Sequence, residues 1–445
     1  KYLFMIKKTL FVTVCLCSIF TFAQTSTKTN LDNLFKTFEK ENKAMGAVSI
    51  FKNGTEIYQK EIGFANIKTK KRGNKFTKYR IGSISKTFTA TIILQQIDEG
   101  KLTLNTLVTA YFPKLPNANK ITIEDLLRHE SGLVNVTNDT NIRSWITKHQ
   151  TRKQMINRFI KNGTEFEPKE KSKYSNTNFI ILSYISEIID KNSFNKILED
   201  RIIKPLHLKR TEFGNPIKPT NNEALPYYFE NNQWNLIDMQ TNMSAPMGAG
   251  AIVSTSSELN VFYSNLFSGK LTSDASLKKL MTIKNGIGLG IMQFEFKDLK
   301  VFGHDGGIDG FQSYALYIPE KNTTMAFTCN GLNAMMMPTV ISILETYFKN
   351  DTSLKKTPTL QLKSEELDVY LGVYSGKTFP AKITFTKKGT TLFAQATGQP
   401  IFELISPKKN LFIYDSMGIH FDFNLQNKTM ELTFGGKKHL LEKEE

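Results

Sequence analysis

Hydrophobic residues recur at two spacings along the chain, and each spacing predicts a type of element. The apolar run 46–52 ends at Asn53-Gly54, and residues 55–62 follow as its predicted hairpin partner. Helical spacing predicts helices over 83–99, 122–128, 177–191, 256–266 and 344–349, and strand-like runs lie at 301–302, 313–317 and 324–328. Strands at both ends with helices between them predict an α+β sheet domain with a mostly helical insert.

The pattern changes near residue 355. Residues 351–364 are polar and include Pro358, so we expect a linker between a domain over 24–350 and a second domain over 365–445. Apolar residues then alternate along four segments, at 381, 383 and 385, at 392, 394 and 396, at 419, 421 and 423, and at 430, 432 and 434. Short alternating strands separated by turn signals predict a small antiparallel barrel or sandwich of about 80 residues.

The first 23 residues have the pattern of a secretory signal peptide. Lys7 and Lys8 precede an apolar run over 9–22, and Ala23 offers a cleavage point. We therefore expect an exported protein, periplasmic or extracellular, with no stable membrane span after cleavage, because the run is shorter than the roughly 20 residues that a span needs. Two of the three cysteines would leave with this segment, and we expect the third, Cys329, to be a buried inert thiol.

Composition limits the class of protein without choosing its partner. Of 445 residues, 40% are hydrophobic and 22% charged, which is ordinary for a globular protein and excludes a disordered tail or a collagen-like chain. The net charge is +17, from 58 basic and 41 acidic residues, and it favours contact with anionic polymers. The lysines are scattered and form no dominant basic block, so we expect no nucleic-acid partner.

The first chemical motif is Ser83-Ile-Ser-Lys86. Residues three apart on a helix share a face, so the Lys86 amine can take the proton of the Ser83 hydroxyl and make it a nucleophile. The pattern alone is weak, because it also begins at Ser49, Ser193, Ser276, Ser353 and Ser406. Only the copy at Ser83 combines a preceding glycine with a long apolar helix.

The second motif is Tyr174-Ser-Asn176. A tyrosine hydroxyl near a lysine can act as a general acid or base, and an asparagine amide can orient a substrate. Tyr263-Ser-Asn265 repeats the motif, but Tyr263 lies within an amphipathic helical pattern and we expect it in the core.

The third motif is His304-Asp-Gly306-Gly307, which contains the only His-x-Gly in the chain. Glycines at a strand edge let a substrate backbone approach closely. The backbone amide of Gly307 could supply one oxyanion donor and that of Ser83 the other.

The order and spacing of the three motifs resemble the serine β-lactamase and penicillin-binding-protein superfamily, in particular the class C β-lactamase-like esterase or D,D-peptidase branch. Four further segments carry the resemblance, at 76–90, 126–133, 248–259 and 288–290. The resemblance covers roughly residues 30–350. It implies an antiparallel sheet flanked by helices with a mostly helical lobe, and a small all-β barrel after it.

The resemblance also implies roles for the motif residues. Ser83 would be the acylated nucleophile, with Lys86 and Tyr174 sharing the general-base role. Asn176, His304, Gly306 and Gly307 would bind substrate, and the amides of Ser83 and Gly307 would form the oxyanion hole. His129 belongs to a shared segment, and we expect it to be structural.

One departure from the superfamily bears on the substrate. True β-lactamases generally use a Lys-Thr-Gly lysine near the substrate carboxylate, and neither Lys-Thr-Gly nor Lys-Ser-Gly occurs at the position where His304 stands. The sequence therefore favours an exported serine hydrolase acting through an acyl-enzyme on D-residue peptides, as a D,D-carboxypeptidase or D-aminopeptidase does, or on esters. Two alternatives stay open: β-lactam hydrolysis as the main activity, and a catalytically idle envelope-binding or sensory homologue.

Other chemistry finds no support in the sequence. There is no Gly-x-Ser-x-Gly elbow and no His-Glu-x-x-His zinc motif, and the six histidines are dispersed. We therefore expect no metal and no cofactor. The expected partner is a small-molecule or peptide substrate, such as one derived from a cell wall; the oligomeric state stays open.

Overall fold

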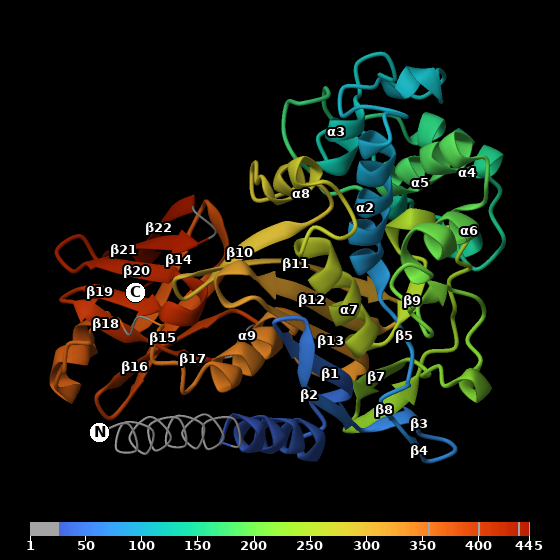
Figure 1. Cartoon of the computed structure of the whole chain (residues 1–445). Coiled ribbons are helices and arrows are strands. Elements are labelled where there is room, and N and C mark those ends of the chain that lie inside the picture. Colours follow the sequence, from blue (N-terminus) through green and yellow to red (C-terminus); the bar gives the residue numbers. More distant parts are fainter. Residues whose placement is uncertain (1–25, 355–356, 399–400, 435–436, 445) are drawn as a thin grey trace, which may run out of the picture. The chain divides into compact units, whose positions relative to one another are not determined.

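The structure, a computed structural model, describes residues 26–354, 357–398, 401–434 and 437–444 (Figure 1). The predicted signal peptide, residues 1–23, lies outside the described residues. The chain divides into two compact units. One unit is formed by Phe35–Gln293 and Val301–Met336, and the other by the remaining described residues. This division into two units does not test the linker and the domain boundaries that the sequence predicts, so those boundaries stay predictions.

A six-stranded sheet has the order β10-β11-β12-β13-β1-β2. Its strands are β1 (Ala44–Lys52), β2 (Thr55–Ile62), β10 (Met292–Phe296), β11 (Leu299–Ile308), β12 (Phe311–Ile318) and β13 (Thr323–Leu332). The pairs β1–β2, β1–β13, β11–β12 and β12–β13 are antiparallel. The predicted hairpin is confirmed: Asn53 and Gly54 have φ of 52° and 76°, as a tight turn between two strands requires.

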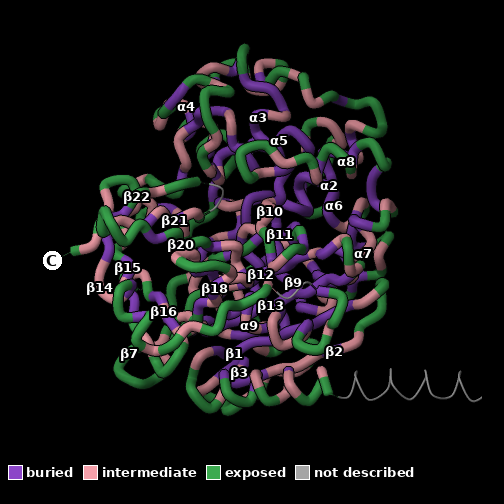
Figure 2. The backbone as a smooth tube through the Cα atoms, turned by 90° about the vertical axis from the view of Figure 1, so that its left-hand side faces the viewer, coloured by how far each residue is buried: buried purple, intermediate pink, exposed green. Residues whose placement is uncertain are grey.

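Strand β13 shows how the sheet is covered on both faces, and it is buried along almost its whole length (Figure 2). On one face Phe327 meets Phe35 of the helix over residues 26–40, with ring centroids 6.3 Å apart. On the other face the Thr328 hydroxyl lies 2.8 Å from the Ser256 hydroxyl at the start of α7. Cys329 is buried and free, as predicted.

In chain order, most of the helices lie between strands β2 and β10. They are α2 (Ser85–Asp98), α3 (Ile123–Leu127), α4 (Arg152–Asn162), α5 (Asn176–Asp190), α6 (Phe194–Leu198), α7 (Ser256–Phe267) and α8 (Asp274–Met281), with α9 (Met336–Tyr347) near the end. Eleven of the fourteen residues of α2 are buried, so this helix is enclosed by others nearly all round (Figure 2). No helix among the described residues is both long and apolar enough to cross a membrane.

Most helix predictions are confirmed within one or two residues. Thr122 caps α3 by accepting the Asp125 N–H, while the Asp125 carboxylate accepts the Thr122 N–H, which is the capping box that the sequence indicated. The segment 344–349, expected to close a terminal helix, overlaps the end of α9, which begins at Met336 and ends at Tyr347. Pro338 lies in its first turn, where the missing N–H costs no helical hydrogen bond.

Shorter elements connect the helices to the sheet. The three-stranded sheet β5-β9-β6 consists of β5 (Tyr79–Arg80), β9 (Ile252–Ser254) and β6 (Glu212–Phe213), and two hairpins pair β3 (Phe64–Asn66) with β4 (Lys71–Arg72) and β7 (Tyr227–Glu230) with β8 (Gln233–Leu236). Two single 3-10 turns matter for the site, η1 (Gly82–Ile84) and η7 (Met247–Ala249). None of these short strands was predicted, because two to four residues are too few for a periodic pattern.

The C-terminal segment forms a nine-stranded sheet in the order β17-β16-β15-β14-β22-β21-β20-β19-β18. Its strands are β14 (Gly372–Gly376), β15 (Phe379–Lys388), β16 (Thr391–Ala396), β17 (Phe402–Glu403), β18 (Ile405–Lys408), β19 (Leu411–Tyr414), β20 (Ile419–Asn424), β21 (Thr429–Phe434) and β22 (Lys437–Lys443). The two edge strands, β17 and β18, are separated in the chain by Leu404 alone, so the sheet nearly closes into the predicted barrel. Alternate residues such as Phe421, Phe423, Met430 and Leu432 fill its core.

We propose that the barrel is a separable domain. Its hydrophobic core contains only residues between Leu367 and Leu441, whereas the largest core of the other unit runs from Ile81 to Ala326. Deleting residues 357–445 should therefore leave a fragment that unfolds in one cooperative thermal transition, followed by circular dichroism beside the full chain. A fragment with no cooperative transition would contradict the proposed boundary.

Candidate active site

Ser83 lies in η1, where the chain passes from strand β5 into the buried helix α2. The preceding residue, Gly82, has φ of 52°, and a Cβ atom there would lie 2.6 Å from the backbone nitrogen of Gly307. A glycine is therefore required both for the conformation and for the close approach of β11. The serine hydroxyl is held at a fixed turn, two residues before the helix begins at Ser85.

Lys86 reaches Ser83 from the first turn of α2. Its Nζ lies 3.0 Å from Ser83 Oγ, 2.8 Å from Asn176 Oδ1 and 2.7 Å from the carbonyl oxygen of Ala249 in η7. The amide and carbonyl oxygens can only accept hydrogen bonds, so they take two N–H groups of the lysine in either protonation state. In the neutral amine the lone pair is then left for the Ser83 hydroxyl.

Burial favours that neutral amine. Lys86 is fully buried, and desolvation holds its pKa well below the ordinary value, while the charge of Asp305 acts in the opposite direction. Among the described residues no carboxylate forms an ion pair with this amine. Lys86 therefore has both the position and the protonation preference of a general base for Ser83.

Tyr174 approaches Ser83 from another direction. Its hydroxyl donates to Ser83 Oγ at 2.7 Å, and burial raises the pKa of Tyr174, so the side chain stays a phenol. The Lys86 Nζ lies 4.8 Å from the centre of the Tyr174 ring. A ring face attracts a cation, so proton uptake by Lys86 is stabilised by the same tyrosine that holds the serine.

His129 fixes the orientation of this tyrosine. The two rings lie 4.5 Å apart, and His129 Nδ1 accepts the backbone N–H of Ser175 at 3.0 Å. Burial, helped by the nearby charge of Lys86, holds the pKa of His129 well below its usual value. The ring is therefore a neutral hydrogen-bond acceptor that packs against Tyr174, in agreement with the structural role expected for it.

Asn176 is the first residue of α5, and Asn135 fixes it. Asn135 Oδ1 accepts the backbone N–H of Asn176 at 3.0 Å and its Nδ2 group at 3.3 Å, and Thr137 Oγ1 accepts from the same Nδ2 at 3.3 Å. These contacts turn the amide so that Oδ1 faces Lys86. Asn135 thus satisfies the start of α5, for which Ser175 provides no side-chain cap.

The third motif lies on β11. His304 is buried, and its Nδ1 lies 2.6 Å from the backbone oxygen of Asp305, so Nδ1 carries the proton. Burial lowers the pKa of His304 to about 4, and the charge of Lys86 acts in the same direction. The imidazole is therefore neutral near pH 7.

Gly306 brings β11 against the strand that precedes the serine. A Cβ atom at Gly306 would lie 1.9 Å from the carbonyl oxygen of Ile81, which also accepts the Ser313 hydroxyl at 2.9 Å. A larger residue would push the two backbones apart. This contact allows Gly307 to face the same cavity as Ser83.

A cavity of about 300 Å³ opens beside Ser83. Ser83, Asn176 and Gly307 form part of its polar wall. Much of the rest is apolar, from Val136, Trp145, Ile146, Ile180, Met239, Ala245 and Pro246. Among the described residues, neither a lysine, an arginine nor a histidine lines it, so an acyl group entering it meets apolar side chains and few polar groups.

The structure brings most of the predicted site residues together. Ser83, Lys86, Tyr174 and Asn176 form one hydrogen-bonded cluster, and Gly307 shares the cavity with Ser83. His304 and Gly306 do not line the cavity, although His304 lies near Tyr174, with ring centroids 6.2 Å apart. The catalytic and substrate-binding roles of all these residues remain predictions.

Sequence reasoning missed the residues whose roles depend on contacts between segments far apart in the chain. Ala249, whose carbonyl accepts from Lys86, lies in one of the segments that carried the family resemblance, but nothing in an alanine indicates such a role. Asn135 lies two residues beyond another of those segments, and only its distance from Asn176 in space reveals its function. The ion pair between Arg80 and Asp309 was also missed.

Comparison with known proteins identifies the family. The family model described as Beta-lactamase matches residues 31–341, which is 311 of the 445 residues. The chain belongs to the beta-lactamase family. This match confirms the predicted superfamily. It also confirms the predicted enzyme class, a serine hydrolase.

Two kinds of relative illustrate the match. Protein flp of Staphylococcus aureus is 26% identical over 319 residues, which cover 68% of this chain and 63% of that protein. The chain therefore spans less than two thirds of the length of that curated relative. D-amino acid amidase from Ochrobactrum anthropi is 22% identical with a TM-score of 0.64, covering 74% of this chain and 99% of its own.

The fold match extends further in one solved structure. The octameric penicillin-binding protein homologue from Pyrococcus abyssi is 20% identical with a TM-score of 0.64, and it covers 93% of this chain and 99% of its own.

Within the residues that the structure describes, no group of three histidine, cysteine or acidic side chains is placed to hold a metal ion.

Replacing Lys86 tests its role as a base. Arginine stays positively charged and cannot release its proton to act as a base, so Lys86→Arg should slow acylation of Ser83 by roughly 10²–10⁴-fold. In the wild type the acylation rate should fall as pH is lowered, because the amine takes up a proton below its lowered pKa. Stopped-flow acylation against pH measures both effects.

The matched control is Lys161→Arg at an exposed position on α4. Its acylation rate and pH profile should equal those of the wild type. An Lys86→Arg enzyme with the wild-type rate and profile would show that another group takes the serine proton.

Proposed function

We propose that this protein hydrolyses amides or esters through an acyl-enzyme on Ser83. The observation that carries the proposal is the position of Ser83 Oγ, 3.0 Å from a desolvated lysine amine and 2.7 Å from a tyrosine hydroxyl. Burial keeps Lys86 inclined to be neutral and Tyr174 protonated, so one group can accept a proton while the other donates one.

The proposed reaction has two steps, acylation of Ser83 and deacylation by water. Lys86 takes the hydroxyl proton as Ser83 Oγ attacks the substrate carbonyl carbon, and the backbone amides of Ser83 and Gly307 stabilise the oxyanion. The carbon–nitrogen or carbon–oxygen bond then breaks, and the leaving group receives that proton directly or through Tyr174. A water molecule then attacks the carbonyl carbon of the acyl-enzyme and gives one proton to Lys86 or Tyr174. The bond from that carbon to Ser83 Oγ breaks, the proton returns to Ser83 Oγ, and the carboxylic acid leaves.

The cavity favours substrates whose acyl portion is apolar. Its walls include Trp145, Ile146 and Ile180, and the nearby His304 is neutral at physiological pH. A substrate carboxylate placed there would lose its hydration without gaining a cation as partner. This supports D-aminopeptidase-like, amidase or esterase activity over a D,D-carboxypeptidase activity that must bind a free carboxylate.

The preference for D-residues rests on similarity. A D-amino acid amidase shares the fold over 74% of this chain. The same electrostatic argument weighs against β-lactam hydrolysis as the main activity, since the β-lactam carboxylate would also lack a fixed cation. Export remains part of the proposal on the sequence of residues 1–23 alone.

Intact-protein mass spectrometry tests the acyl-enzyme. A p-nitrophenyl ester or a D-phenylalanine amide should be turned over by the wild type, and a slowly released acyl reagent should add one acyl mass to it. Ser83→Ala should show neither the added mass nor turnover, because the nucleophilic oxygen is absent.

The controls separate the alternatives. Ser131→Ala removes a buried hydroxyl that bonds to Asn178 Oδ1 away from Lys86, so it should still acquire the adduct. Turnover of the L-phenylalanine amide at the same rate would remove the D-preference. Rapid release of a cephalosporin adduct would favour a β-lactamase, and turnover that survives in Ser83→Ala would sink the acyl-enzyme itself.

A further inference from the structure

A buried ion pair ties the strand before the nucleophile to the turn after Gly307. Arg80 lies three residues before Ser83 and Asp309 two residues after Gly307, and their side chains are each 2% exposed where they pair. Further hydrogen bonds offset part of the cost of burying this pair, although Arg80 Nε finds no partner among the described residues. Arg80 also donates to the carbonyl oxygen of Asn215 at 3.1 Å.

The same pair holds one wall of the cavity. Asp309 accepts the Thr241 hydroxyl at 2.7 Å, and its two carboxylate oxygens lie 3.2 and 3.1 Å from the Thr241 backbone nitrogen. Arg80 donates to the Thr241 carbonyl oxygen at 3.4 Å. Thr241 is thus bound through its side chain, its N–H and its carbonyl, although its segment has no helix or strand between β8 and η7.

This segment contributes several of the cavity-lining residues. Met239, Thr241, Ala245 and Pro246 line the cavity, and Asp309 lines it from the turn between β11 and β12. Without regular secondary structure, the segment is held by such side-chain contacts together with single backbone hydrogen bonds, such as the one from the Asn242 N–H to the Ile146 carbonyl oxygen at 2.9 Å. The Arg80–Asp309–Thr241 group therefore lies where it can fix the width of the cavity.

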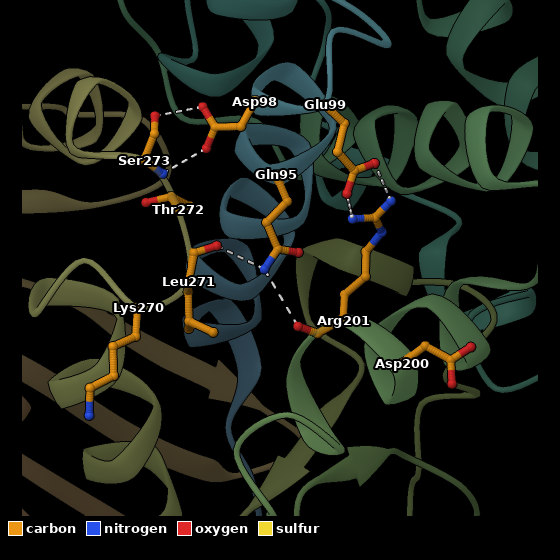
Figure 3. Close-up of a pocket in the computed structure, with 9 residues that line it drawn as sticks. All are labelled: Gln95, Asp98, Glu99, Asp200, Arg201, Lys270, Leu271, Thr272 and Ser273. Carbon is orange, nitrogen blue, oxygen red and sulfur yellow. Dashed lines mark hydrogen bonds and ion pairs between the residues drawn. The ribbon is translucent and has the colours of Figure 1, made fainter.

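A second ion-pair cluster provides a contrast. Arg201 donates to both carboxylate oxygens of Glu99, at 2.7 and 2.9 Å, in a pocket at the far end of α2 from Ser83 (Figure 3). Arg201 Nη2 also donates to Asp190 at 3.0 Å. The cation is fully engaged by carboxylates, so this pocket carries no ligand site of its own. The Arg201–Glu99 ion pair is a suitable control. Its loss should affect the stability of the fold, and it lies roughly 20 Å along α2 from Ser83.

We propose that Arg80, Asp309 and Thr241 are positioning residues that set which acyl groups the cavity accepts. The inference rests on the proposed acyl-enzyme at Ser83. Holding the segment over 239–246 against the β11–β12 turn keeps the cavity narrow and apolar, so that an acyl chain filling it gains contacts that a shorter chain does not. Loosening the group reduces that gain and leaves the chemistry at Ser83 in place.

The test compares p-nitrophenyl hexanoate with p-nitrophenyl acetate in wild type, Thr241→Val and Asp309→Asn. Thr241→Val removes one hydrogen bond and keeps the ion pair, so it stays informative if the loss of charge in Asp309→Asn prevents folding. The ratio of kcat/KM for hexanoate to that for acetate should fall by about fivefold to tenfold in the variants, somewhat less than the roughly 10–200-fold effect of losing a whole methylene contact, because the cavity is loosened and not removed.

The ratio distinguishes a positioning role from a merely structural one. Overall destabilisation lowers the activity on both esters together, and Glu99→Gln should do this with an unchanged ratio. An unchanged ratio in Thr241→Val and Asp309→Asn, beside a lowered melting temperature, would overturn the positioning role alone. If the wild type turns over neither ester and gains no acyl mass at Ser83, the proposed function itself fails.

Discussion

Lys86 Nζ lies out of water among a hydroxyl, an amide oxygen and a carbonyl oxygen, and the remainder of the site depends on this desolvated amine. An ammonium is costly to bury, so a lysine in such a place is inclined to give up its proton. The acceptors come from η1, α5 and η7, which are far apart in the sequence. The fold must hold these three elements together so that the Asn176 and Ala249 oxygens take two N–H groups of the amine and its lone pair is left for Ser83.

Close backbone contacts provide that arrangement, and glycines make them possible. A Cβ atom at Gly82 or Gly306 would collide with the backbone of the opposite segment. At Gly248, in η7, it would lie 2.6 Å from the Thr89 hydroxyl of α2. At each of these glycines, a turn or strand approaches the region around Ser83 more closely than a residue with a Cβ atom would permit. The distances at the serine are thus set by backbones, which vary less than long side chains do.

Local signals explain which parts of this arrangement the sequence could predict. The β1–β2 hairpin, the capping box of α3 and the apolar helices α2, α5 and α7 depend on residues close in sequence, and their patterns were sufficient. Alternating residues likewise predicted the barrel strands. Six Ser-x-x-Lys copies could be reduced to the one at Ser83 because only there did a glycine and an apolar helix accompany the pair.

Long-range polar contacts explain what could not be predicted. Asn135, the Ala249 carbonyl and the Arg80–Asp309 pair acquire their roles from segments tens to hundreds of residues away. An asparagine in a loop or an arginine beside a strand is typical of many surface positions, so composition and spacing carry no signal for them. These residues contribute to the geometry of the site only after folding has brought their partners together and excluded water from around them.

The electrostatics of the cavity follow from the same removal of water. Lys86 is surrounded by acceptors, burial lowers the pKa of His304 so that its ring is neutral near pH 7, and the carboxylate of Asp309 is matched by Arg80 and Thr241. Each polar group that surrounds Ser83 is therefore neutral or already satisfied. A charged substrate group entering the cavity would give up its hydration without a matching partner, whereas an apolar group gains contact with Trp145 and Ile180. Under the proposed function, we therefore expect selection among substrates to depend on shape and apolar area, with any charged portion of the substrate left in solvent.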